Sequence, residues 1–277
     1  MAKKALCIGI NNYPGTQMDL QGCVNDANDW AAALTQRGFA VSKLLDSEAT
    51  KAAMMTAMED LIAKASKGDS LVITFSGHGT YQPDTDGDEA DGLDEALCPY
   101  DLQTSGAALT DDEIRVLFAA RKAGVRIVLI SDSCHSGTVT RAAAAERDAD
   151  TRPRFMPMGN WLPDKLLPRN RAGEVAATTV APVGATPLLG AFSNKLGDLL
   201  LAGCKEGPNN FSSDARISGR DNGAFTYYAL KALKMLKADA TYADWHKSIG
   251  KYLPSASYPQ VPQIVGGDAA RKGRIFE

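Results

Sequence analysis

Short apolar stretches alternate with amphipathic stretches along the first half of the chain. Residues 6–10, 71–75 and 125–130 are almost entirely apolar, which is typical of strands buried on both faces. Residues 24–37 and 50–66 instead repeat apolar side chains three and four positions apart, as on one face of a helix. This alternation predicts an α/β fold with a mostly parallel sheet covered on both sides by helices.

The rest of the chain completes this pattern less regularly. Further strands are expected at residues 40–45 and 199–202, and further helices at 111–123 and 223–237. Residues 258–276 show a mixed pattern and predict no single helix or strand. We find no internal repeat, so we expect about six strands in a single domain, 1–277.

Two polar motifs follow two of the predicted buried strands. Ser-Gly-His-Gly, with His78, follows the strand at 71–75, and Ser-Asp-Ser-Cys-His-Ser-Gly, with Cys134, follows the strand at 125–130. Binding sites of parallel sheets lie at the carboxyl ends of strands. If these strands are neighbours, His78 and Cys134 lie within about 5–10 Å of each other.

These residue types suit nucleophilic catalysis. A nearby imidazole holds a thiol as a thiolate or takes its proton during attack, so a Cys-His dyad needs no third acid. His135 adjoins Cys134 and points away from it, and His246 has no polar companions in sequence. The motifs of serine hydrolases, zinc peptidases, papain-type peptidases and phosphate loops do not occur. Cys134 and His78 are therefore the predicted catalytic pair.

Composition excludes several other classes of protein. The chain has 277 residues, is 44% hydrophobic, and carries a net charge of −3, which gives no basic field for nucleic acid or an anionic membrane. Five widely spaced cysteines fit neither a disulfide framework nor a zinc ribbon. No apolar run reaches the roughly 18 residues of a membrane span, so we expect a cytoplasmic protein.

The motifs together resemble a known family. Ala-Leu-Cys-Ile-Gly-Ile-Asn-Asn-Tyr at 5–13, Phe-Ser-Gly-His-Gly at 75–79 and Asp-Ser-Cys-His-Ser-Gly at 132–137 look like the metacaspase branch of the caspase-like cysteine peptidases, as found in bacteria and non-animal eukaryotes. The resemblance implies a three-layer caspase-like sandwich that works as a monomer. Its parts would be a large-subunit-like region 1–137, a processing loop 138–187 and a small-subunit-like region 188–277.

The resemblance also implies how the site works. Cys134 would attack the scissile carbonyl, His78 would protonate the leaving amine, and backbone N–H groups near Gly79 and Cys134 would form the oxyanion hole. Asp132 shares a face with Cys134, and a carboxylate there attracts Arg or Lys of a protein substrate. In metacaspases this pocket is acidic, and its matching positions here are Cys23, Asp26, Ser76 and Asp132. From the residues alone, the favoured interpretation of Asp26 is an exposed carboxylate at a helix start, stabilised by the helix dipole.

An acidic block suggests a calcium site. Residues 84–113 hold eleven carboxylates, and no Lys or Arg lies between Lys67 and Arg115. A hard cation with oxygen ligands would relieve their repulsion, although a solvated hairpin is the simpler reading, and an EF-hand fails because Glu89 stands where glycine is needed. By resemblance to calcium-dependent metacaspases, the ligands are Asp94, Asp111 and Asp112; a further aspartate of the family falls near Arg141 here.

The loop after the cysteine carries many basic residues and is expected to be exposed. Each is a candidate self-cleavage site for an Arg/Lys-specific peptidase: Arg141, Arg147, Arg152, Arg154, Lys165, Arg169 and Arg171. We expect the loop to block or shape the cleft until calcium or cleavage moves it; a plain insertion is the alternative. Two other functions stay open: a proteolytically silent, calcium-responsive scaffold, and a thiol hydrolase acting on small amides.

Overall fold

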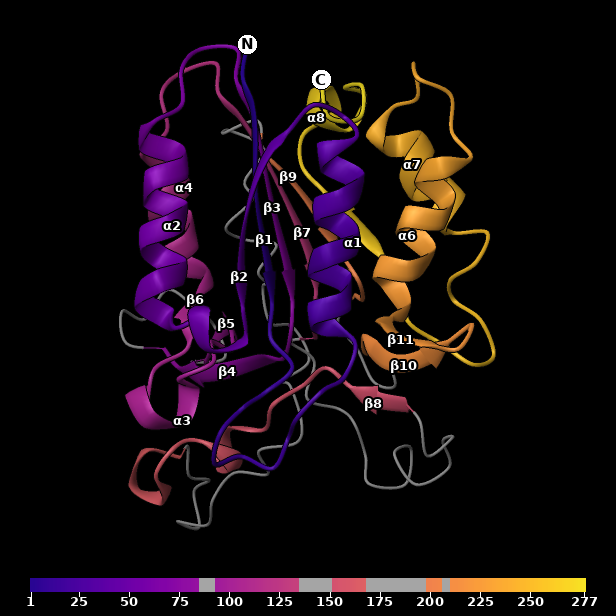
Figure 1. Cartoon of the computed structure of the whole chain (residues 1–277). Coiled ribbons are helices and arrows are strands. Elements are labelled where there is room, and N and C mark those ends of the chain that lie inside the picture. The colour runs from indigo at the N-terminus through magenta and orange to yellow at the C-terminus, as the bar shows by residue number, and fades with distance from the viewer. Residues whose placement is uncertain (85–92, 135–150, 168–197, 206–209) are drawn as a thin grey trace.

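A computed structural model describes residues 1–84, 93–134, 151–167, 198–205 and 210–277. Its centre is a six-stranded sheet in the order β12-β9-β7-β3-β1-β2 (Figure 1). The strands are β1 (Lys3–Gly9), β2 (Ala40–Leu45), β3 (Ser70–Ser76), β7 (Arg126–Asp132), β9 (Leu199–Ala202) and β12 (Gln263–Val265). All neighbouring pairs are parallel except β12 with β9. The α/β prediction with a mostly parallel sheet is confirmed.

Helices cover both faces of this sheet. The main ones are α1 (Cys23–Thr35), α2 (Lys51–Ala63), α4 (Asp111–Ala119), α6 (Ala224–Lys234) and α7 (Tyr242–Ile249). Helices α2 and α4 lie on one face, and α1, α6 and α7 on the other (Figure 1). Short helices include η1 (Asp46–Glu48), α3 (Leu102–Ser105) and α8 (Asp268–Arg271).

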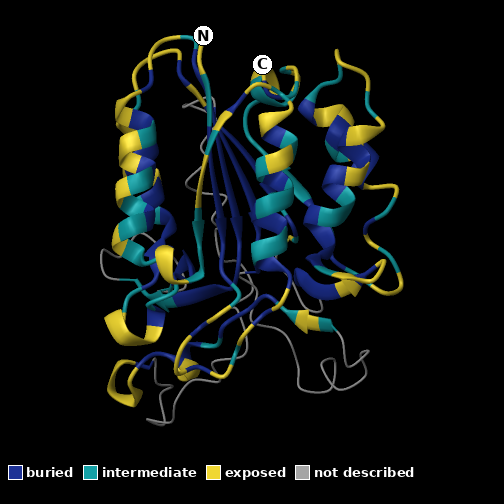
Figure 2. Cartoon of the chain, viewed as in Figure 1, coloured by how far each residue is buried: buried dark blue, intermediate teal, exposed yellow. Residues whose placement is uncertain are grey.

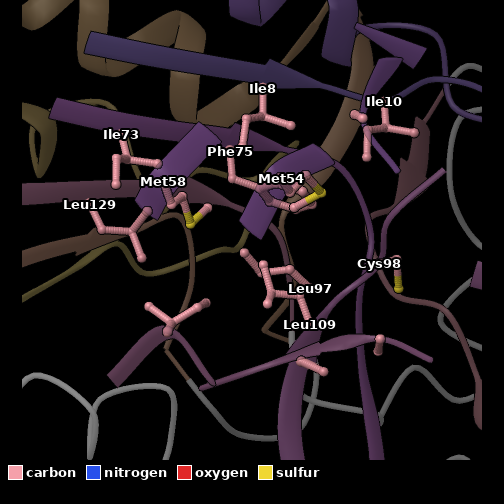
Figure 3. Packing of buried hydrophobic residues seen from close by; sticks show 14 of the residues in the cluster. Ile8, Ile10, Met54, Met58, Ile73, Phe75, Leu97, Cys98, Leu109 and Leu129 are labelled. Carbon is pink, nitrogen blue, oxygen red and sulfur yellow. The ribbon is translucent and has the colours of Figure 1, made fainter. Parts of the chain in front are cut away.

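Alternating side chains of the buried strands build two separate cores. In β1, Leu6 and Ile8 face the α2–α4 side, whereas Ala5 and Cys7 face the α1–α6 side. Figure 3 shows the first core, where Met54 and Met58 of α2 pack over Phe75 of β3. The central strands are buried along most of their length while the helices are exposed on their outer faces (Figure 2). This explains why the strands are continuous apolar runs in the sequence.

Short strands that the sequence did not predict gather at the carboxyl end of the sheet (Figure 1). One antiparallel sheet contains β4 (Gly79–Pro83), β5 (Leu93–Leu97) and β6 (Leu109–Thr110), and another contains β8 (Thr151–Pro153), β10 (Ser213–Ile217) and β11 (Arg220–Gly223). These strands have two to five residues and lack a long apolar run. They surround the ends of β3 and β7, where the two polar motifs lie.

The described part of the predicted loop is packed against the protein. Residues 151–167 form β8 and two 3-10 turns, η2 (Met158–Asn160) and η3 (Asp164–Leu166). Phe155, Met156 and Trp161 are buried in the first core. The expectation of an exposed loop is therefore wrong for this segment, because its apolar residues provide a face that packs. Arg152 and Lys165 are exposed, and Arg141, Arg147, Arg169 and Arg171 lie outside the described residues.

Within the ranges given above, no helix has both the length and the apolar character to cross a membrane.

Candidate active site

The two polar motifs meet because their strands are neighbours. Strands β3 and β7 pair in parallel, with Ser76 opposite Asp132 at the last matched position. His78 and Cys134 each come two residues later, so both chains leave the sheet at the same edge. Both side chains are buried, with 1% of His78 and 0% of Cys134 exposed.

His78 is held in one orientation by its neighbours. Its Nε2 lies 2.6 Å from the main-chain oxygen of Met18, and because a carbonyl only accepts, Nε2 carries the proton. The lone pair is then on Nδ1. The main-chain N–H of His78 donates to the Tyr13 hydroxyl at 2.8 Å, and the two rings are 4.8 Å apart.

The free nitrogen of His78 faces the main chain of a buried arginine. The ring lies against the backbone of Arg154, but Nδ1 makes no hydrogen bond of good geometry with any residue that the structure describes. Burial lowers the pKa of His78 to about 4. The imidazole is therefore neutral at neutral pH and has a lone pair available to accept a proton.

Two backbone N–H groups converge on one carbonyl oxygen. The N–H of Gly79 and the N–H of Cys134 donate to the main-chain oxygen of Arg154, at 3.0 and 3.1 Å. The thiol of Cys134 also lies 3.7 Å from the main-chain oxygen of Asn210, to which it donates. The structure thus brings the predicted pair of donors together around a peptide carbonyl.

The side chain of Arg154 is completely buried among three carboxylates. Its Nη2 lies 2.7 Å from Asp26 and 2.9 Å from Asp214, and its Nη1 lies 3.2 Å from Asp132. A Cβ atom on Gly223 would come within 2.5 Å of Nη1, so the close approach of this guanidinium requires glycine there. The cluster is a pocket shaped for a planar cation.

Backbone and side-chain donors from distant elements orient each carboxylate. Asp26 accepts hydrogen bonds from the N–H of Gly223 and the amide of Asn222. Asp132 accepts from the Ser212 hydroxyl and the N–H of Thr226, and Asp214 accepts from the N–H groups of Gln21 and Gly22. The donor–acceptor distances all lie between 2.7 and 3.1 Å. Burial raises the pKa of Asp26 to about 7, and the charge of Arg154 opposes this rise. Asp26 is 0% exposed, which excludes the reading of a solvated helix-start carboxylate.

The sequence predicts four residues of this pocket, and a fifth, Asp214, is found only in the structure. Cys23 opens α1, is buried and lies within the electrostatic influence of Arg154, and Ser76 pairs in register with Asp132. Asp214 was missed because it lies in β10, in a Ser-Ser-Asp stretch that carries no distinctive sequence signal. Only the fold brings it to the pocket, from 188 positions after Asp26.

The main chain around Arg154 is bound as an added strand. Before it, β8 pairs antiparallel with β10, and the N–H of Arg154 donates to Ser212 at 2.9 Å. After it, the N–H of Met156 donates to the carbonyl of Gly79 at 2.8 Å. Backbone pairing with alternate side chains in pockets is how extended peptides bind at sheet edges. The segment is therefore paired on both sides of Arg154 in the manner of an extended peptide ligand.

The predicted metal ligands lie in β5 and at the start of α4. Asp94 of β5 and Asp111, the first residue of α4 directly after β6, are buried, each 5% exposed. Asp112 already pairs with Arg115. In the portions of the chain that the structure describes, no group of three His, Cys, Asp or Glu side chains could hold a metal ion.

Known proteins share both the sequence and the fold of this chain. A family model described as the metacaspase, peptidase C14 domain matches residues 3–142. Metacaspase-1A of Aspergillus fumigatus is 30% identical over 95% of this chain and 68% of its own length. Metacaspase-1 of Cryptococcus neoformans is 42% identical over 49% of this chain, but this match spans only 32% of that protein. The chain thus matches about a third of the length of several of these relatives.

Solved structures agree with this relationship. The crystal structure of a protein from Geobacter sulfurreducens has 30% identity and a TM-score of 0.70, covering 100% of this chain and 98% of that one. Caspase-1 from Spodoptera frugiperda has 13% identity and a TM-score of 0.55, over 95% of this chain and 86% of that one, and supports the caspase-like fold. The sequence match, the fold and the paired motifs at the ends of β3 and β7 lead to one conclusion: the chain belongs to the metacaspase family of cysteine peptidases.

Proposed function

We propose that the protein is a cysteine endopeptidase that cleaves peptide bonds after Arg or Lys. One observation carries this proposal: the carbonyl of Arg154 lies between two N–H donors beside Cys134 while its guanidinium fills a pocket of three carboxylates. A substrate that binds in the same way presents its scissile carbonyl to the thiol. The acidic pocket favours a basic side chain and repels Asp.

In the reaction, His78 Nδ1 accepts the proton of the Cys134 thiol, and the sulfur attacks the carbonyl carbon. The oxygen becomes an oxyanion, which the N–H groups of Gly79 and Cys134 stabilise; one such donor is typically worth about 3–4 kcal/mol in the transition state. The C–N bond then breaks, and His78 gives the proton to the leaving amine. Water hydrolyses the thioester and restores the thiol.

Internally quenched peptides that differ only in Arg, Lys or Asp at the cleaved position test this proposal. We expect turnover of the Arg and Lys peptides by the full chain, no turnover of the Asp peptide, and no activity in Cys134→Ala. Turnover that survives Cys134→Ala would refute the dyad. Hydrolysis of small amides without peptide cleavage would favour the small-amide hydrolase, and no turnover with a folded chain would favour the scaffold.

We propose further that the bond between Arg154 and Phe155 is the self-processing site and that its segment blocks the cleft before processing. Among the basic residues of the predicted loop that the structure describes, Arg152 and Lys165 are exposed and only Arg154 lies in the pocket. The test is intact-mass analysis and N-terminal sequencing of the purified chain over time. A fragment that begins at Phe155, formed by the wild type and not by Cys134→Ala, supports the proposal, and cleavage only at other residues contradicts it.

Calcium stimulation stays a proposal that rests on the family resemblance and on two buried carboxylates, Asp94 and Asp111. Thermal unfolding of the full chain with calcium and with chelator tests it independently of activity. We expect calcium to raise the melting temperature of the wild type and to have no effect on Asp94→Asn. An unchanged melting temperature in the wild type would reject the site.

Monomeric action is likewise proposed, and light scattering at assay concentration checks it.

A further inference from the structure

A second thiol lies beside the proposed nucleophile. Strands β7 and β9 run parallel and stay together at their carboxyl ends, where the N–H of Gly203 donates to Ser131 at 2.8 Å. Cys134 and Cys204 follow directly after these two strand ends. The thiol of Cys204 donates to the main-chain oxygen of Ser133 at 3.6 Å and lies close enough to the thiol of Cys134 for this neighbour to raise the pKa of Cys204.

The peptidase reaction does not use Cys204. It differs from the other cysteines in its exposure, since Cys7, Cys23, Cys98 and Cys134 are buried and Cys204 is partly exposed. Its place on a neighbouring strand also suits a covalent link. Adjacent strands are about 4.8 Å apart, and disulfides join Cα atoms about 4.4–6.8 Å apart.

We propose that Cys134 and Cys204 form a reversible disulfide when the protein meets a peroxide, and that this bond switches the active site off. Hydrogen peroxide oxidises the sulfur of Cys134 to a sulfenic acid while His78 takes the thiol proton, and one peroxide oxygen leaves as water. The sulfur of Cys204 then attacks the sulfenic sulfur, its proton goes to the second oxygen, and this oxygen leaves as water. In total, two thiols and one peroxide give one disulfide and two waters.

The disulfide has two consequences for the enzyme. It removes the nucleophile, so peptide hydrolysis stops. It also protects Cys134 from further oxidation, because thiols reduce a disulfide. A sulfenic acid without a partner thiol is instead oxidised to the sulfinic acid, which simple thiols do not reduce.

The test treats the full chain with hydrogen peroxide and maps its peptides by mass spectrometry without reduction. We expect a linked peptide containing Cys134 and Cys204 that dithiothreitol separates. Peptide hydrolysis should be lost with peroxide and recovered with dithiothreitol. In Cys204→Ala and Cys204→Ser the loss should be permanent, with sulfinic or sulfonic acid at Cys134. Cys7→Ala, on the other side of the sheet, is the matched control and should behave as the wild type.

The mapping result stands even if the chain shows no peptidase activity, so failure of this proposal is separate from failure of the proposed function. A wild-type chain whose Cys134 remains a free thiol, or becomes a sulfinic acid without linkage to Cys204, overturns the proposal. Equal recovery of activity in the wild type and in both Cys204 variants overturns it as well.

Discussion

Replacing Arg154 separates the contribution of its guanidinium to binding in the pocket from the contribution of the surrounding main chain. Arg154→Lys keeps a positive charge in the pocket, and Arg154→Gln removes it. Arg152→Gln is the matched control, because Arg152 lies two residues away in the same segment and is exposed. Its side chain donates to the main-chain oxygen of Asp19, and its backbone pairing with β10 does not depend on the side chain.

The expected magnitudes follow from the contacts. A lysine ammonium cannot bridge Asp26, Asp132 and Asp214 as the two Nη atoms do, and each lost charge-assisted hydrogen bond costs about 1.5–3 kcal/mol. Self-cleavage after residue 154 should then slow by about 10- to 100-fold, since 1.36 kcal/mol is tenfold in rate. Glutamine leaves three buried carboxylates without a cation, and breaking a buried pair costs about 3–5 kcal/mol of stability.

The assay follows the appearance of the fragment beginning at Phe155, together with the free energy of unfolding by denaturant. We expect self-cleavage in the order wild type, Arg154→Lys, Arg154→Gln, with Arg152→Gln equal to the wild type in both measurements. Equal cleavage of the wild type and Arg154→Gln at this bond, or a stability of Arg154→Gln within 1 kcal/mol of wild type, would refute the reasoning that the acidic pocket binds the arginine.

Three further predictions concern other residues of the site. Burial lowers the pKa of His78 from 6.5 to about 4, so its neutral form favours the folded state above pH 6.5 and this contribution is lost as pH falls towards 4. The loss amounts to about 3 kcal/mol, and denaturant unfolding at pH 7 and 4.5 should show a smaller loss for His78→Gln than for the wild type. Asp214→Asn should lower kcat/KM for an Arg peptide by about 10- to 100-fold, with less effect on a Lys peptide; unchanged kinetics would exclude Asp214 from the pocket. Trp161 is buried and donates to the Thr80 hydroxyl at 3.1 Å, so Trp161→Ala should cost about 3–5 kcal/mol of unfolding free energy and Trp161→Phe about 1 kcal/mol; equal effects would contradict this packing.

The sequence predicts those parts of the molecule that depend on local pattern. The buried strands of the sheet are continuous apolar runs, and the motifs that follow β3 and β7 locate His78 and Cys134 because parallel strands end at one edge. The apolar spacing also predicts α1, α2, α4 and α6, whereas α7 was not predicted. These features require no knowledge of contacts between distant residues.

The rest of the site depends on distant contacts. Strand β10 is short and mostly polar, and its pairing with β8 is fixed by tertiary packing, so Asp214 could not be placed from sequence. Arg154 reads as an ordinary surface charge, since arginine is almost never fully buried without partners. Its partners lie 128, 22 and 60 positions away, and only the folded chain brings them together.

The segment that carries Arg154 belongs to the same chain as the cleft it fills, so it acts as a tethered ligand. Tethering gives a ligand an effective concentration that reaches about millimolar for short flexible linkers, and any external substrate must compete with it. After a cut at Arg154, each half of the segment is still joined to the chain at its other end, and hydrogen bonds still hold both halves, from Arg154 to Ser212 and from Met156 to Gly79. Dilute substrates would therefore gain access only when an additional change weakens the binding of the segment, and activity would be limited by its departure rather than by the chemistry at Cys134.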